Sequence, residues 1–413
     1  MNDKNICRYG TLKGVRRQFV QTNVPNVPDS IDLLESLVAF DTTSANSNLE
    51  LIHWARNLLL EFGASVSLIS NSEKTKANLY ATIGPKDAPG IMLSGHTDVV
   101  PVAGQQWSTS PFKLSVKDAK AYGRGTADMK GFIACALRAV FLASGRTLRT
   151  PLHLALSYDE EIGCVGVHSL LDMLAQAPFR PLMCLVGEPT ELKVATGHKG
   201  KMACHVNCIG KAAHSSLAPQ ATNAIHLATD LISRIRQRQI SICAEGHQDS
   251  AYEVPYTTLH ASNIRGGVAL NIVPDQCQFD LEIRNLAEDD AGSILEDIRD
   301  DAAQIVTIAR QLSVEADICL DVFNTYPGLN TDVDSRVVDY VKSLTGQNAP
   351  IKVAFGTEAG LFSTRLSIPS VVCGPGSMQQ GHKPDEYISL DQLHQCDVML
   401  DRLIVTLEQG VPV

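Results

Sequence analysis

Several features that mark particular protein classes are missing from this 413-residue sequence. It has no block of lysines and arginines and no basic stripe interleaved with aromatic residues, and 45 acidic residues exceed 35 basic ones, so nucleic-acid binding is not expected. The longest apolar stretch, at residues 131–143, is interrupted by Arg138 and is too short to cross a membrane. We therefore expect a soluble, non-secreted protein with neither a membrane nor a nucleic-acid partner.

The sequence also lacks two short motifs that would indicate other chemistry. Its eleven cysteines include no CxxC pair, and most lie in apolar runs, where a reduced cysteine packs as a small hydrophobic residue. This usage favours a reducing cytoplasm. Cys204 and Cys208 have a spacing that can hold a metal, but their alternating segment favours a strand. No GxGxxG turn is present, which argues against a nicotinamide-dependent oxidoreductase.

The first part of the chain alternates between helical and strand patterns. Two amphipathic helices are predicted within residues 30–62. Strand patterns follow at residues 65–70, 78–84, 90–95, 152–158 and 181–187, with helical patterns at 130–145 and 165–176. Such alternation predicts an α/β fold, with a mixed sheet whose core is mostly parallel and helices on both faces. Ligands of such a sheet bind at its strand ends.

Length and a change of pattern predict more than one domain. A single hydrophobic core rarely serves more than roughly 250 to 300 residues, and after residue 199 the strands become longer and strictly alternating. We predict that residues 200–315 form an inserted α+β domain, while residues 31–199 and 316–413 together form the catalytic domain. Residues 1–30 are predicted to be an N-terminal extension.

Five segments place a potential metal ligand directly after an apolar run. They are His96 and Asp98 in SGHTDVV, Asp128 in GTADMKG, Glu160 and Glu161 in SYDEEIG, Glu188 in VGEPT and His382 in QQGHKPDE. Taken singly, a histidine at a strand end is usually a hydrogen-bonded structural residue, and a glutamate before proline is commonly a solvated turn. Because the strands belong to one predicted sheet, we expect the five segments to meet at one edge.

The residue types suit a pair of divalent ions. Two imidazoles and three carboxylates can hold two ions if one carboxylate bridges them, and such a pair activates a shared water for hydrolysis. Residues two apart on an extended segment face the same way, so Asp98 is expected to accept the far N–H of His96. Adjacent residues face opposite ways, so one of Glu160 and Glu161 should bind an ion and the other act as general base and acid.

Taken as an ordered set, these segments resemble a family of dinuclear zinc or cobalt amidohydrolases. The family includes acetylornithine deacetylase, succinyl-diaminopimelate desuccinylase, carboxypeptidase G and the aminoacylases, and the resemblance covers the chain from about residue 31. The segments HKGK, YEVPYTTL, FGTEAGLF and GPGSMQQGHKPDEYI are most similar to the acetylornithine deacetylases.

The resemblance implies a role for each proposed site residue. Asp128 would bridge the two ions, and the bond that follows it, to Met129, would be cis. His96 and Glu188 would hold one ion, and Glu161 and His382 the other. Glu160 would be the catalytic base, and Asp98 would orient the histidine. The residues to which the resemblance gives these roles are, in chain order, His96, Asp98, Asp128, Glu160, Glu161, Glu188 and His382.

The inserted domain resembles the family's lid, which also makes the dimer contact. His214 in GKAAHSSLAP would then reach a metal site, usually that of the partner subunit, and donate to the scissile carbonyl oxygen. Asn271 and Arg284 are candidates for binding the substrate's carboxylate, since a guanidinium can bind both of its oxygens. We accordingly expect a homodimer.

The expected reaction is metal-dependent hydrolysis of an N-acyl amino acid, with N2-acetyl-L-ornithine, an intermediate of arginine biosynthesis, as the first substrate to test. Two alternatives stay open. One is a related activity of the same family: desuccinylation, deacylation of another amino acid, or dipeptide cleavage. The other is a metal-binding scaffold that has lost catalysis, against which the presence of Glu160 argues.

Overall fold

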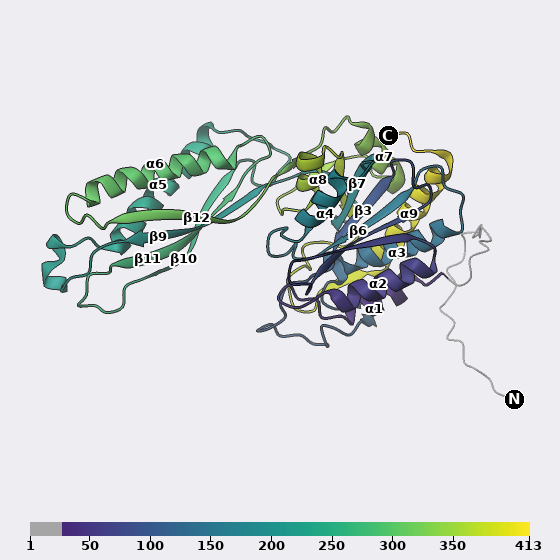
Figure 1. The fold of residues 1–413 in the computed structure, drawn as a ribbon, viewed down its shortest axis with the longest axis horizontal. Helices are drawn as coiled ribbons and strands as arrows, with labels where there is room; N and C mark the ends of the chain where they lie inside the picture. Colours follow the sequence, from purple (N-terminus) through teal and green to yellow (C-terminus); the bar gives the residue numbers. More distant parts are fainter. Residues whose placement is uncertain (1–26) are drawn as a thin grey trace.

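The computed structural model describes residues 27–413, so the predicted extension at residues 1–30 lies almost wholly outside the described residues. Figure 1 shows two lobes: a large α/β lobe that carries the C-terminus, and a smaller lobe formed by the middle of the chain. Within the described residues, none of the helices combines the length and the hydrophobicity needed to cross a membrane.

The large lobe contains a nine-stranded mixed sheet. Its strands, in spatial order, are β1 (Ser65–Ser70), β2 (Ala77–Ile83), β6 (Leu152–Ser157), β3 (Ile91–His96), β7 (Met183–Pro189), β15 (Ser370–Gly374), β8 (Ala195–His198) and β13 (Leu329–Asn330), with β14 (Ile351–Val353) paired to β8. The central strands β6, β3, β7 and β15 run parallel to one another, and β1, β2 and β13 pair antiparallel. The predicted α/β fold with a parallel core is confirmed.

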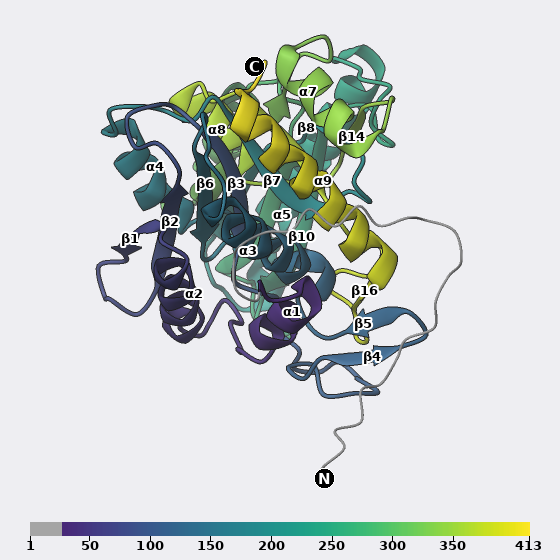
Figure 2. The ribbon, with the colours of Figure 1, turned by 90° about the vertical axis from the view of Figure 1, so that its right-hand side faces the viewer.

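Helices cover both faces of this sheet (Figure 2). One face packs against α1 (Ser30–Val38), α2 (Leu49–Glu61), α3 (Gly131–Ser144), α7 (Arg336–Thr345) and α9 (Leu390–Gln409); the other packs against α4 (Val167–Ala175) and α8 (Ala359–Leu366). Strand β3 supplies both cores, because Ile91 and Leu93 point to the first and Met92 to the second. A strand buried on both faces has to be apolar throughout.

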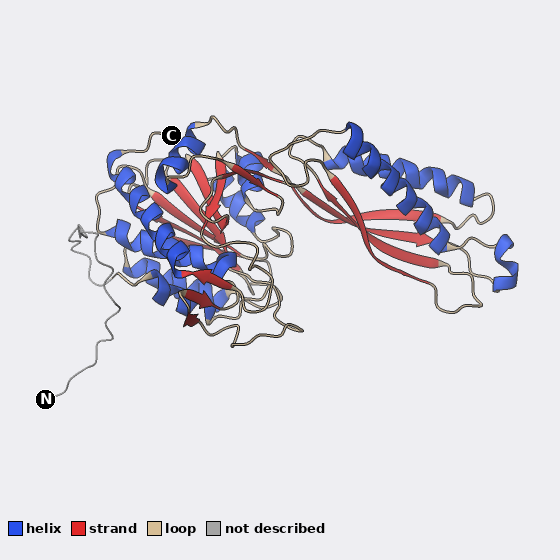
Figure 3. Cartoon of the chain, turned by 180° about the vertical axis from the view of Figure 1, so that it is seen from behind, coloured by secondary structure: helices blue, strands red, loops and turns tan. Residues whose placement is uncertain are grey.

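The smaller lobe is a four-stranded antiparallel sheet that packs against two helices (Figure 3). Its strands lie in the order β10 (Thr258–Gly266), β11 (Gln276–Arg284), β9 (Lys201–Ile209) and β12 (Asp317–Tyr326), and its helices are α5 (Ala224–Glu245) and α6 (Ala291–Ala309). We predicted that the inserted domain ends at residue 315, which leaves out its last strand. β12 pairs with β9 along its length, and Ile318 and Leu320 belong to the core of this lobe.

Three smaller parts complete the described chain. The turn η1 (Thr126–Lys130) leads into α3, the 3-10 turn η2 (Ser215–Gln220) lies in the inserted lobe, and a three-stranded sheet joins β4 (Ser115–Lys117), β5 (Lys120–Tyr122) and β16 (Tyr387–Ser389). The sequence patterns did not predict this small sheet, because three-residue strands have too few positions to show a period.

Candidate metal centre

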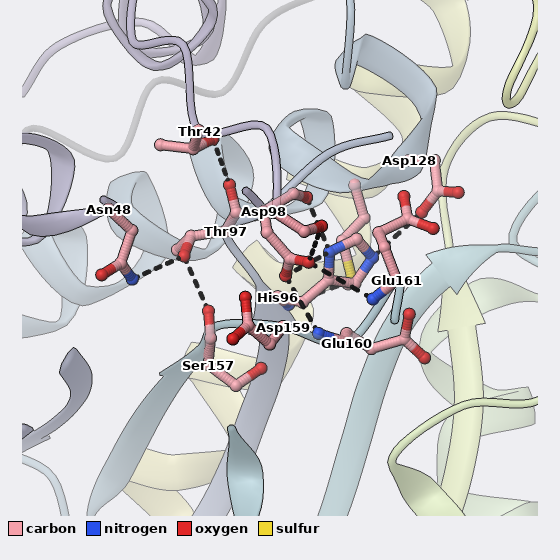
Figure 4. Close-up of polar contacts among 12 residues, drawn as sticks. Thr42, Asn48, His96, Thr97, Asp98, Asp128, Ser157, Asp159, Glu160 and Glu161 are labelled. Carbon is pink, nitrogen blue, oxygen red and sulfur yellow. Dashed lines mark hydrogen bonds and ion pairs between the residues drawn. The ribbon is translucent and has the colours of Figure 1, made fainter. Parts of the chain in front are cut away.

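The ends of parallel strands bring most of the predicted ligands to one edge of the large sheet. β3 ends at His96, β7 carries Glu188 beside its last residue, and Glu160 and Glu161 follow shortly after β6. The hydroxyl of Thr97 joins two of these strand ends, because it donates to the last carbonyl of β6 at 2.7 Å (Figure 4). Carboxyl ends of parallel strands form the expected ligand-binding edge of an α/β sheet.

Asp128 lies between the two histidines. Its Oδ1 is 3.1 Å from Nε2 of His96, and its Oδ2 is 3.2 Å from Nε2 of His382. The residue sits in η1, and the peptide bond to Met129 is cis. The two oxygens of one carboxylate therefore face two different imidazoles, which is the arrangement that a bridging ligand requires.

The other carboxylates divide between the same two histidines. Glu188 Oε1 lies 3.6 Å from Nε2 of His96, whereas Glu161 Oε2 lies 3.0 Å from Nε2 of His382. Among the described residues, two groups of side chains each bring their ligand atoms within 4.8 Å of one another. One group is His96, Glu160 and Glu188, and the other is His96, Asp128 and Glu161. The Nδ1 of His96 already contacts a backbone carbonyl, so His96 can bind one ion only. The second ion would need His382.

Asp98 holds the site together in a way that differs from our prediction. The closest acceptor to Nδ1 of His96 is the backbone carbonyl of Asp98, at 2.9 Å, and the carboxylate is 3.6 Å away. The carboxylate instead accepts the backbone N–H groups of Glu160 and Glu161, at 3.1 and 3.3 Å (Figure 4). It also accepts the hydroxyl of Ser44 at 2.7 Å. Asp98 thus links the histidine strand to the paired glutamates.

Burial controls protonation at this site. It raises the pKa of Glu160 to about 8 and that of Glu161 to about 7, and neighbouring carboxylates act in the same direction. Burial also holds the pKa of Glu188 well above its ordinary value. For Asp128 burial acts to raise the pKa, but hydrogen bonds from the two imidazoles lower it. Contacts with Asp128 and Glu161 raise the pKa of His382 to about 10.

This donor set fits divalent metal ions. Imidazole nitrogens and carboxylate oxygens are the ligand types that zinc and cobalt accept. The side chains of Asp128, Glu161 and Glu188 are about 5 to 6% exposed and face one another. Several buried carboxylates so close together repel one another unless positive charge lies between them, and a divalent cation would favour their ionised forms.

A cavity of about 360 Å³ opens over these ligands, and the inserted lobe forms part of its wall. From that lobe, Lys201, Arg284 and Tyr326 line it. Arg284 donates from Nε and Nη2 to the carboxylate of Glu282, at 2.9 and 3.2 Å, and from Nη1 to the hydroxyl of Tyr326, at 2.9 Å. A guanidinium has five N–H groups, so two are not used in these hydrogen bonds.

His214 and Asn271 lie together in the inserted lobe but do not line this cavity. Both are exposed, the backbone N–H of Ser215 donates to the carbonyl of Asn271 at 3.0 Å, and His214 forms an isolated bridge with Ile272. One chain therefore brings together seven predicted ligand and catalytic residues with Arg284, and leaves His214 and Asn271 apart.

Three residues that organise the site, Arg124, Glu386 and Lys76, were not predicted. The side chain of Glu386 accepts three backbone N–H groups of the segment 125–128, and Arg124 pairs with it at 2.7 Å. Lys76 forms an ion pair at 2.5 Å with Asp159, the residue before the paired glutamates. Glu386 lies in the segment GHKPDEYI, but neither periodicity nor spacing indicates which residue of that segment turns inward.

Comparison with known proteins identifies the family. The model of peptidase family M20/M25/M40 matches residues 92–406. An acetylornithine deacetylase from Myxococcus xanthus is 34% identical over 379 residues, which cover 90% of this chain and 95% of the relative. Another from Pasteurella multocida is 32% identical over 388 residues, covering 92% and 98% of the two chains.

Solved structures share the fold at lower identity. A metallo-carboxypeptidase of the M20 family from Sulfolobus solfataricus has a TM-score of 0.74 at 18% identity, with 93% of this chain and all of that chain covered. A dinuclear metal-binding peptidase of the same family from Bacillus subtilis has a TM-score of 0.67 at 16% identity, covering 92% and 98%. The family model and these relatives show that the chain belongs to peptidase family M20/M25/M40 and is a metal-dependent hydrolase.

Proposed function

We propose that this protein hydrolyses the amide bond of N-acyl amino acids, and that its substrate is N2-acetyl-L-ornithine, which yields L-ornithine and acetate. The observation that carries the proposal is Asp128 set between two imidazoles, with Glu160 beside them as an additional carboxylate. The choice of substrate is supported by relatives named acetylornithine deacetylase that are 32 to 34% identical over most of both chains. The reaction belongs to arginine biosynthesis, and we propose a cytoplasmic enzyme.

We assign the ligands of two ions, Zn²⁺ or Co²⁺, by the contacts of each imidazole. Asp128 would bridge the ions, His96 and Glu188 would hold the first, and Glu161 and His382 would hold the second. When bound, such ions activate a water and withdraw electron density from the acyl oxygen. The protein contributes ligand geometry through the Asp98 carboxylate, which fixes the backbone that carries both glutamates.

Glu160 is the group we assign to proton transfer. As base it removes a proton from the attacking water, whose oxygen forms a bond to the acyl carbon. As acid it then delivers that proton to the amine nitrogen when the carbon–nitrogen bond breaks. Burial supports the acid step, because it raises the pKa of Glu160 above that of an ordinary carboxyl group and so favours its protonated form.

The inserted lobe would supply substrate recognition. Arg284 lines the cavity and has two N–H groups not used in those hydrogen bonds, which suits one carboxylate bound through both oxygens. Asn271 lies beside His214 on a surface that does not face this cavity, so we propose that both act in the cavity of a partner subunit in a homodimer. There His214 would donate to the acyl oxygen as negative charge develops on it.

The proposal is tested with a panel of N-acyl amino acids, assayed for released amine after loading the protein with zinc or with cobalt. The panel contains the acetyl and succinyl derivatives of ornithine and of other amino acids, together with dipeptides. The highest kcat/KM is expected for N2-acetyl-L-ornithine. Faster turnover of a succinyl derivative or a dipeptide would replace the substrate but keep the reaction class. Absence of turnover by protein that holds both ions would favour a scaffold without catalysis.

A further inference from the structure

The segments that carry His382 and Asp128 need contacts within the protein to hold them in position for the ions. His382 has a φ of 62°, in the left-handed region, which is unfavourable for a residue with a Cβ atom and persists only where surrounding contacts hold it. Its side chain is 48% exposed, so packing contributes little to its position. By contrast, the segment 125–128, which carries Asp128, is buried.

The carboxylate of Glu386 organises the segment of Asp128. Its Oε1 accepts the backbone N–H groups of Ala127 and Asp128, at 2.9 and 3.1 Å, and its Oε2 accepts that of Gly125 at 3.0 Å. The same Oε2 accepts Nη1 of Arg124 at 2.7 Å, and both side chains are 1% exposed. A buried ion pair with its oxygens fully used is a rigid support, because moving either partner would leave a charge unpaired.

Arg124 extends this support toward His382. Its Nη1 also donates to the carbonyl of Lys383 at 3.3 Å, and its Nη2 donates to Oε1 of Gln105 at 2.5 Å. Gln105 in turn donates from Nε2 to the carbonyl of His382 at 3.0 Å. The guanidinium lies 5.0 Å from the ring centre of Trp107, whose indole N–H also donates to Gln105, so the amide has a fixed orientation.

We propose that Gln105, held by Arg124 and Glu386, is a positioning residue for His382 and thereby sets the affinity of the ion bound by Asp128, Glu161 and His382. The ion at His96 and Glu188 does not depend on it. The inference rests on the ligand assignment proposed above. Gln105 touches neither ion nor substrate in this arrangement; it acts through the backbone of His382.

The test compares Gln105→Met with Gln106→Met in the full-length protein. Methionine keeps the length of the side chain and removes both hydrogen-bonding groups, and Gln106 is an exposed neighbour outside the network. Metal-free protein is titrated with Co²⁺, and both calorimetry and the visible absorption of bound cobalt are recorded. His382→Ala identifies which binding step belongs to the ion at His382. Circular dichroism and the unfolding temperature of the metal-free protein check the fold.

Loss of the hydrogen bond to His382 should weaken that one step by about five- to tenfold, and leave the other step within about twofold. Gln106→Met should leave both steps unchanged. Equal weakening of both steps, or no change in either, would overturn the inference while the ligand assignment stands. Uptake of fewer than two ions by the unaltered protein would instead overturn the ligand assignment, and the inference with it.

Discussion

The two sheets of this protein differ in how their side chains are used. Strands β3, β6 and β7 of the large sheet are buried along their whole length, and function begins only where they end. Strand β11 of the inserted sheet alternates between buried and accessible residues, and its accessible side chains remain available along the strand. A buried parallel sheet therefore places its functional side chains at one edge, while the open sheet keeps accessible side chains along its length.

The sharpest test of this comparison removes the proton-transferring group from the edge of the large sheet. We expect Glu160→Gln to lower kcat by about 10² to 10⁴-fold, since general acid–base catalysis contributes that much. Metal content by elemental analysis should stay at two ions, because Glu160 is not assigned as a ligand. Glu253→Gln, an exposed glutamate of the inserted lobe, is the matched control. Full activity of the Glu160 variant would refute its role.

His214 tests whether the exposed surface of the inserted lobe serves a second subunit. His214→Ala should lower kcat by about 10² to 10³-fold, the usual cost of losing a donor to the developing oxyanion. Mixing it with Glu160→Gln should restore about a quarter of wild-type activity, because half of the dimers would then contain one intact site. A mixture that stays inactive, although the two variants exchange subunits, would contradict action across the dimer.

Arg284 tests substrate recognition by the end of the inserted sheet. Replacing it by Ala should raise KM for N-acyl amino acids by about 10 to 100-fold, because a hydrogen bond to a charged group contributes roughly 1.5 to 3 kcal/mol. Hydrolysis of an N-acyl amine that lacks the carboxylate should change little. Arg265→Ala, at an exposed position of β10, controls for loss of surface charge. Equal effects on both substrates would remove Arg284 from carboxylate binding.

The smallest expected effect is a pH dependence of the folding stability that comes from two buried histidines of the large sheet. Burial lowers the pKa of His153 and of His198 to about 4, from 6.5. Between these values the unfolded chain binds more protons than the folded one, so stability is present above pH 6.5 and falls as the pH decreases toward 4. Each histidine contributes at most about 3 kcal/mol to this loss.

Thermal unfolding at several pH values measures how steeply the unfolding temperature falls as the pH decreases. His153→Gln removes one titrating group, so the unfolding temperature should fall less steeply between pH 6.5 and 4 than in the unaltered protein. His53, on the surface of α2, provides a matched control through His53→Gln, which should leave the slope as it was. Identical slopes for all three proteins would show that His153 titrates normally.

Much of the fold was predictable because its patterns are local. The continuous apolar runs at β3, β6 and β7 identified buried strands, and the alternation at β9 and β11 identified an open sheet. The end of the inserted lobe was placed wrongly at residue 315, because β12 resembles other strands and only its pairing with β9 assigns it to that sheet.

The sequence by itself determined the kinds of ligand, the family, and the positions of His96, Glu188 and the paired glutamates at the ends of buried strands, since these are properties of short segments. Only the tertiary structure decided that one carboxylate of Asp128 faces two imidazoles, that the Asp98 carboxylate holds the backbone of the paired glutamates, and that Glu386 supports Asp128. Glu386 and Asp128 are separated by 258 positions. Contacts at that separation depend on how whole elements pack, and no local periodicity records them.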